Sequence, residues 1–106
     1  MMDTISELHF VKLPNKYRND HFQNWLSIAV FRLLMVLDSK PVHSAIEELK
    51  KSGLVSTRVR LSRECESQFY QLSAKHDLTK LDTFLFVCHH IETHPAIYFE
   101  KTKTVA

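Results

Sequence analysis

Residues 56–61 read Ser-Thr-Arg-Val-Arg-Leu, a short segment in which polar and less polar side chains alternate at every position. Alternation of this kind is typical of a β-strand with one buried face and one exposed face. Two guanidinium groups beside a hydroxyl on the exposed face are suited to hydrogen-bond base edges in a DNA major groove. We therefore expect base contacts from the outward residues, which are Ser56, Arg58 and Arg60.

Two helical patterns follow this strand and are separated by a short turn. Ser62 can cap a helix that extends to about His76, and Thr79 can cap a second helix that extends to about Thr93. A single short strand finds no partner within such a unit, and its backbone groups would stay unpaired. We therefore expect it to pair antiparallel with the same strand of a second molecule, which makes the protein a homodimer with a two-stranded ribbon.

This order of strand, helix, turn and helix resembles the ribbon-helix-helix family of bacterial, phage and plasmid regulators, to which the Arc and Met repressors and many antitoxins belong. The family signature is an alternating strand that ends in a hydrophobic residue and proline, then a helix, a Gly-Leu-Ser turn and a second helix. Here the strand ends at Leu61 and Ser62, and the turn at 77–79 reads Asp-Leu-Thr. Ser62 therefore stands where the signature has proline, and Asp77 stands where it has glycine. The resemblance covers residues 55–93.

The resemblance implies that the outward strand residues enter the major groove and that the start of the last helix holds a DNA phosphate. A helix N-terminus favours anions in any case, because its first amides lack intrahelical acceptors and its dipole is positive there. The arginines of the strand are expected to read guanines. The expected phosphate contacts are Thr79, Lys80 and Arg63, with Lys75 as a weaker candidate.

The N-terminal half, residues 1–54, lies outside this resemblance. Residues 4–13 can form a short strand before Pro14, and residues 10–14 echo the later strand, but no helix pair with a short turn follows them. Residues 21–37 are apolar nearly all round. A helix without a polar face is typical of a core or of a subunit contact, so we expect this helix to form at least part of a dimer interface.

The expected fold is mainly α-helical, and the chain is expected to divide into three parts. Residues 1–54 would form a helical extension for dimerisation or partner contact, in which a second helix ends at Gly53. Residues 55–94 would form the ribbon-helix-helix DNA-binding domain, and residues 95–106 a C-terminal tail.

The composition describes one small globular domain. The chain has 106 residues, of which 44% are hydrophobic and 25% charged, and its net charge of +2 permits a local basic patch.

Two cysteines and no recognisable signal peptide favour a cytoplasmic setting. The apolar run at 26–37 is too short for a membrane span of about 20 residues. With a single glycine, phosphate-binding loops are excluded, and we expect neither an enzyme nor a cofactor.

A histidine-rich stretch raises the alternative of a metal site. His90 and His94 are four residues apart, a spacing that places both on one helical face, and Cys88 and His89 lie beside them. No second pair of cysteines or histidines at ligand spacing completes a tetrahedral site. We therefore expect structural or solvent-facing histidines and no metal.

The leading hypothesis is a homodimeric, sequence-specific DNA-binding transcriptional regulator, either a repressor or an activator, of bacterial, phage or plasmid type. Its N-terminal half would enlarge the dimer interface or recruit another regulator or RNA polymerase. One alternative is a winged-helix regulator in which the helix at 41–52 reads DNA and residues 55–64 form a wing, although a second wing strand is missing. The other is an antitoxin- or inhibitor-type protein-interaction module, which the modest charge and the apolar first helix suit.

Overall fold

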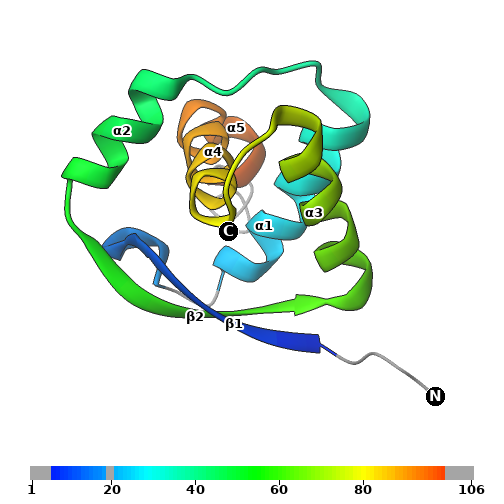
Figure 1. Cartoon of the computed structure of the whole chain (residues 1–106), viewed down its shortest axis with the longest axis horizontal. Coiled ribbons are helices and arrows are strands. Elements are labelled where there is room, and N and C mark those ends of the chain that lie inside the picture. Colours follow the sequence, from blue (N-terminus) through cyan, green and yellow to red (C-terminus); the bar gives the residue numbers. More distant parts are fainter. Residues whose placement is uncertain (1–5, 19–20, 100–106) are drawn as a thin grey trace.

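The computed structural model describes residues 6–18 and 21–99. In this part of the chain the fold is mainly helical, as predicted, with one two-stranded antiparallel sheet. Figure 1 shows the two strands along one side of the molecule and the helices stacked on the other side. The elements are β1 (Ser6–Pro14), the 3-10 helix η1 (Asn15–Tyr17), α1 (Phe22–Phe31), its π-helical continuation η2 (Arg32–Val36), α2 (His43–Lys51), β2 (Leu54–Ser62), α3 (Arg63–His76), α4 (Lys80–Thr93) and α5 (Pro95–Tyr98).

The two strands pair along their whole length, from Ser6 opposite Ser62 to Pro14 opposite Leu54. Both strands alternate between buried and exposed residues, as the sequence of β2 predicts. The inward residues contact the helices, and the outward residues face solvent. The inward set is His9, Val11 and Leu13 from β1 and Thr57, Val59 and Leu61 from β2.

The prediction that strand 56–61 has no partner in its own chain is therefore wrong. β1 supplies the partner, and the ribbon is completed without a second molecule. The opposite edge of β2 is also partly covered, because the backbone amide of Arg60 donates a hydrogen bond to Gln23 Oε1 at 3.2 Å. Strand pairing across a homodimer is consequently not needed to satisfy the backbone of β2.

The chain repeats the order strand, helix, helix: β1 is followed by α1 and α2, and β2 by α3 and α4. When the strands are aligned from their first residues, Val11 aligns with Val59 and Leu13 with Leu61. Phe10 aligns with Arg58 and also lies opposite it. An approximate two-fold axis therefore passes through this pair and relates the two strands.

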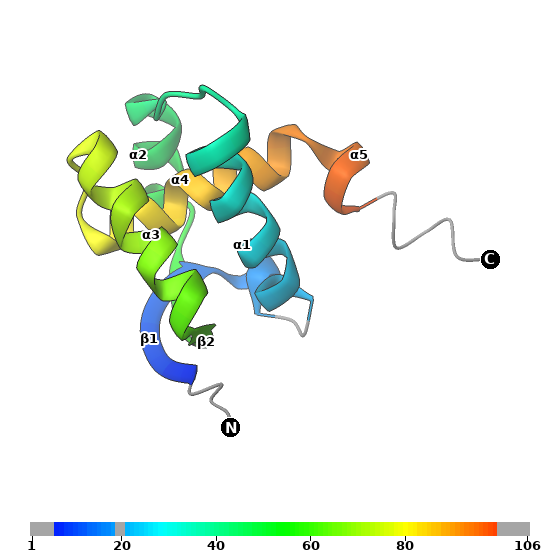
Figure 2. The same ribbon diagram turned by 90° about the vertical axis from the view of Figure 1, so that its right-hand side faces the viewer.

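The predicted division between residues 54 and 55 does not separate two structural units. β1 and β2 lie on either side of that point and form one sheet, and one hydrophobic core includes Leu13, Leu26, Phe69 and Phe84. The N-terminal half is therefore an integral part of the fold and not an extension. Figure 2 shows α1 and α3 side by side above the strands, in agreement with their direct packing.

Helix α4 is the centre of the core. Its residues from Thr83 to Cys88 are all buried, as are His90 and Ile91. The helix at 21–37, which the sequence predicts to lack a polar face, is instead buried on one side only, because Leu26 and Leu33 face inward. Its other side leaves apolar residues in contact with solvent: Ile28, Phe31, Met35 and Val36.

Local signals placed the boundaries of α3 and α4 well, whereas α2, predicted at 41–52, begins at His43 without a side-chain cap. The predicted caps are confirmed, because Ser62 Oγ accepts from the amide of Cys65 and Thr79 Oγ1 accepts from the amide of Asp82, each at 3.1 Å. The predicted stop at Gly53 is also confirmed, and this glycine has a φ of 93°. Asp77 ends α3 with a φ of 55°, the left-handed conformation that glycine most often takes at the end of a helix.

The C-terminal tail predicted at 95–106 begins with an ordered helix. Helix α5 starts at Pro95, which is suited to a first helical turn. Tyr98 in this helix is buried, and its hydroxyl lies 2.7 Å from His90 Nε2 of α4. Residues 100–106 lie outside the described part of the chain.

Gly53 and Asp77 both have positive φ, and substitutions at these two positions are expected to have opposite effects on stability. Asp77→Gly removes the steric strain of a left-handed side chain, about 1–2 kcal/mol, against a glycine entropy cost of about 0.5–1 kcal/mol. We therefore expect a gain of about 0.5 kcal/mol in the free energy of unfolding by urea. Gly53→Ala, the matched control, should lose about 1 kcal/mol, since its φ disfavours a Cβ although nothing lies within 4 Å. A loss of stability in the Asp77→Gly variant would contradict the conclusion that the left-handed conformation strains Asp77.

Candidate nucleic-acid interface

The exposed face of the ribbon is defined by six outward residues, and we call it the outer face. Each β1 residue of this face lies opposite a β2 residue, with about 5 Å between directly opposed Cβ atoms. None of the six is acidic, and three are cationic. The opposed pairs are Leu8 with Arg60, Phe10 with Arg58, and Lys12 with Ser56.

The base-contacting residues predicted from the sequence thus lie together on the outer face, and all three are exposed. Sequence reasoning missed the contribution of β1 to the same face. Lys12 adds a third cation, and Phe10 presents an aromatic side chain that is 70% exposed. One signal in the sequence could have indicated β1 as the second strand of the ribbon. Leu13 and Pro14 form a hydrophobic-then-proline pair, which the strand end at Leu61 and Ser62 lacks.

Helix α4 begins beside the β1 edge of the ribbon. Lys80 and Leu81 form a hollow of about 300 Å³ together with Phe10, Val11 and Lys12. The structure therefore brings the predicted phosphate-contacting residue Lys80 next to the outer face, on the side of β1. The first amides of a helix have no intrahelical acceptor, and the side-chain Oγ1 of Thr79 accepts from the amide of Asp82. The amides of Lys80 and Leu81 thus point from the helix start without an acceptor from the helix itself.

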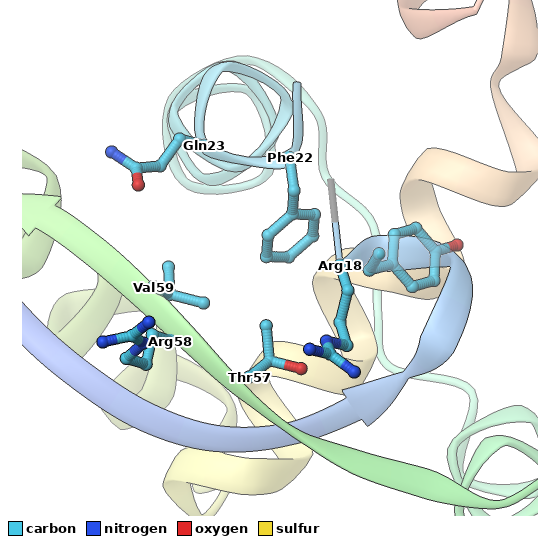
Figure 3. Close-up of a pocket in the computed structure, with 7 residues that line it drawn as sticks. Arg18, Phe22, Gln23, Thr57, Arg58 and Val59 are labelled. Carbon is cyan, nitrogen blue, oxygen red and sulfur yellow. The ribbon is translucent and has the colours of Figure 1, made fainter. Parts of the chain in front are cut away.

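A second hollow, of about 230 Å³, lies along the β2 edge (Figure 3). It is lined by Arg18, Phe22 and Gln23 on one side and by Thr57 and Arg58 on the other. Figure 3 shows the side chains of Arg18 and Arg58 on either side of Thr57. The sequence patterns did not single out Arg18 as a candidate site residue.

The position of Arg18 depends on its neighbour Tyr17, which fastens η1 to α4. Tyr17 Oη donates to Glu92 Oε2 at 2.7 Å and to the carbonyl of Cys88 at 3.2 Å. Burial raises the pKa of Tyr17, so the hydroxyl keeps its proton and remains a donor. Burial acts to raise the pKa of Glu92 as well, but hydrogen bonds from Lys16 and Tyr17 outweigh it and hold that pKa below its usual value. This buried contact holds the segment beside β2.

Two further predicted contacts lie away from the outer face. Arg63 begins α3 beyond the end of β2 and lines a different hollow, together with Met35 and Gln68. Lys75 lies in the last turn of α3, about 20 Å along a helix that leads away from the ribbon. The structure therefore does not bring Arg63 or Lys75 together with Lys80.

The cations around the ribbon are not neutralised by the described part of the chain. Within residues 6–18 and 21–99, the ion pairs involve other groups, such as Lys16 with Glu92 and Lys50 with Asp82. Carboxylates would otherwise offset the charge of the ribbon surface. The cations without an ion pair to a described residue are Lys12, Arg58 and Arg60 on the outer face and Arg18 and Lys80 at its two edges.

The winged-helix alternative requires features that the structure does not have. A wing is a hairpin, whereas β1 and β2 are separated in sequence by α1 and α2. Helix α2, which would read DNA, exposes the carboxylates of Glu47 and Glu48. Carboxylates on this face would be repelled by phosphates.

The histidine-rich stretch has a structural role. His90 is buried against Tyr98, and the Nδ1–H of His94 donates to the carbonyl of His90 at 2.9 Å. In the described part of the chain, no three histidine, cysteine or acidic side chains are placed to hold a metal ion. Burial, aided by the neighbouring charges of His94 and Arg32, lowers the pKa of His90 to about 4. His90 is therefore neutral at pH 7.

Comparisons with known proteins identify no family for this chain. A scan against protein-family models found no match, and searches of curated proteins and of solved structures found no similar chain. Over residues 6–18 and 21–99, none of the helices has the length and apolar character required to cross a membrane.

The lowered pKa of His90 predicts a loss of stability in acid. The unfolded chain binds a proton at His90 below about pH 6.5, whereas the folded chain does so only near pH 4. The contribution of His90 to the free energy of unfolding is therefore fully present above about pH 6.5. It decreases as the pH falls, by at most about 1.4 kcal/mol per pH unit. Urea unfolding at pH 7 and pH 5 should show a smaller decrease for His90→Gln than for the unmodified chain. An equal decrease in both proteins would contradict the assignment.

Proposed function

We propose that this protein binds double-stranded DNA through the outer face and acts as a sequence-specific transcriptional regulator of bacterial, phage or plasmid type. The observation that carries the proposal is a two-stranded ribbon with three cations and no acid on its free face. Such a ribbon fits a major groove about 12 Å wide. Arg58 and Arg60 would donate to guanine O6 and N7, and Ser56 would hydrogen-bond a neighbouring base.

We propose further that the fold is a ribbon-helix-helix unit closed within one chain. The repeated order of strand and two helices supports this, as do the aligned inward residues of the two strands. Leu13 and Pro14 match the strand end of the family signature, and Asp77 takes the left-handed position of its glycine. The first unit differs by a longer connection at 37–42 between its helices.

The cations at the two ribbon edges would contact the phosphates that border the groove. Lys80 lies at the β1 edge and Arg18 at the β2 edge. Because the phosphates of both strands line a major groove, one cation on each side can fix the ribbon in its register. The Thr79 hydroxyl and the α4 amides would assist at the β1 edge, and Arg63 would contact a phosphate beyond the ribbon end.

A specific observation favours a second function, binding of another protein. Ile28, Phe31 and Met35 of α1 and η2 are exposed on the side of the molecule that borders α3. This surface could accommodate a second copy, another regulator or RNA polymerase, and in an antitoxin- or inhibitor-type module it would be the main functional site. A salt titration of binding to random-sequence duplex DNA separates the two functions, because phosphate contacts give a steep loss of affinity with salt.

Replacing the outer-face arginines should abolish sequence preference. Each bidentate contact contributes about 1–3 kcal/mol of discrimination, so Arg58→Ala/Arg60→Ala should bind its preferred duplex no more tightly than an unrelated one. Circular dichroism should show an intact fold, because both side chains are exposed. Lys75→Ala, on the far part of α3, is the matched control and should keep full preference. Retained preference in the double variant would exclude these arginines from base contact.

The edge cations should affect all sequences alike. Lys80→Ala and Arg18→Ala each remove one phosphate contact, so the slope of log affinity against log salt should decrease in magnitude by about 1 in each variant. Sequence preference should stay the same. An unchanged slope would remove the substituted residue from the phosphate contacts.

A further inference from the structure

The approximate symmetry of the ribbon is kept on its inward face and lost on its outer face. The two-fold axis through Phe10 and Arg58 exchanges Val11 with Val59 and Leu13 with Leu61, which are identical residues. All four are buried, so packing against the helices accounts for their identity. The outward residues are exposed, with Leu8 at 38% and Phe10 at 70%, so packing constrains them less than it constrains the inward residues. Their differences can therefore reflect what lies outside the protein.

On the outer face the exchanged residues differ in chemistry. The axis exchanges Phe10 with Arg58, an apolar ring with a guanidinium group, and Leu8 with Ser56. The third exchange, Lys12 with Arg60, alone keeps a positive charge. One end of the ribbon therefore presents Arg60 opposite Leu8, whereas the other end presents Lys12 opposite Ser56.

Phe10 has no packing role that explains its position. Its side chain is 70% exposed and lies in the middle of the outer face. A phenyl ring donates no hydrogen bond to a phosphate or a guanine edge, but it makes favourable apolar contact with the C5-methyl group of thymine in the major groove. In a ribbon that enters the groove, Phe10 and Arg58 would reach adjoining bases, because they are directly opposed.

We infer that this protein reads an asymmetric, non-palindromic duplex, with Arg58 on a guanine and Phe10 on the methyl group of a nearby thymine. The inference rests on the proposed function. A ribbon built from two identical strands presents the same residues to both half-sites and selects inverted repeats. A single copy of this chain instead binds in one orientation, with Arg60 and Leu8 at one end of the site and Lys12 and Ser56 at the other.

Selection from a random-sequence duplex pool tests the inference. The unmodified chain should enrich one sequence without internal two-fold symmetry. The variant Leu8→Ser/Phe10→Arg/Lys12→Arg makes the outer faces of the two strands identical and should enrich an inverted repeat instead. All three substituted residues are exposed, so the fold should persist. Inverted repeats enriched by the unmodified chain, or the same site enriched by both proteins, would overturn the inference alone. No enriched sequence with either protein would overturn the proposed function as well.

The role of Phe10 is tested separately on the enriched duplex. Replacing each thymine in turn by deoxyuridine removes one methyl group and should lower the affinity of the unmodified chain about fourfold at one position, the effect of one buried methyl group. The Phe10→Ala variant should bind the thymine duplex and the deoxyuridine duplex of that position with equal affinity. The Leu8→Ala variant should still bind the thymine duplex more tightly. Equal binding of thymine and deoxyuridine duplexes by the unmodified chain at every position would exclude recognition of a thymine methyl group by Phe10.

Discussion

The antiparallel pairing of β1 with β2 is the constraint on which the rest of the structure depends. An isolated strand leaves a row of backbone donors and acceptors unpaired, and this pairing satisfies one such row in each strand from within the chain. It also fixes which side chains face outward, because a shift of one residue would turn every side chain to the other face. With Val11 and Val59 held inward, Phe10, Lys12 and Arg58 are necessarily presented to solvent.

The helices turn this ribbon into a surface with defined edges. Helix α4 is buried at the centre, and its first residue, Lys80, lies at the β1 edge. Near the other end of α4, Glu92 and the carbonyl of Cys88 hold Tyr17, which places Arg18 at the β2 edge. One central helix thus positions the cations on both sides of the ribbon. The proposed phosphate contacts and base contacts are consequently parts of one rigid arrangement.

The sequence predicts those features that depend on neighbouring residues. The alternation in β2, the caps at Ser62 and Thr79 and the stop at Gly53 are local, and the structure confirms them. The pairing of β1 with β2 joins residues about half the chain apart, and local patterns do not encode it. The repeat was also obscured, because the connection between α1 and α2 is longer than the tight turn at Asp77. Arg18 joins the candidate site only through the contact of Tyr17 with α4, which periodicity does not indicate.

Whether one chain supplies both strands is tested most directly by nuclear Overhauser effects in a mixture of isotope-labelled and unlabelled protein. The Arg60 amide donates to Gln23, and amides two residues apart in a strand point to the same side. The Arg58 amide therefore also points away from β1, and Phe10 and Arg58 form a pair without mutual hydrogen bonds, with their Cα atoms about 4.5 Å apart. Our account predicts a strong effect between the Hα atoms of Phe10 and Arg58 within the labelled chain, and none between labelled and unlabelled chains. An effect between these atoms on different chains would contradict a ribbon closed within one molecule.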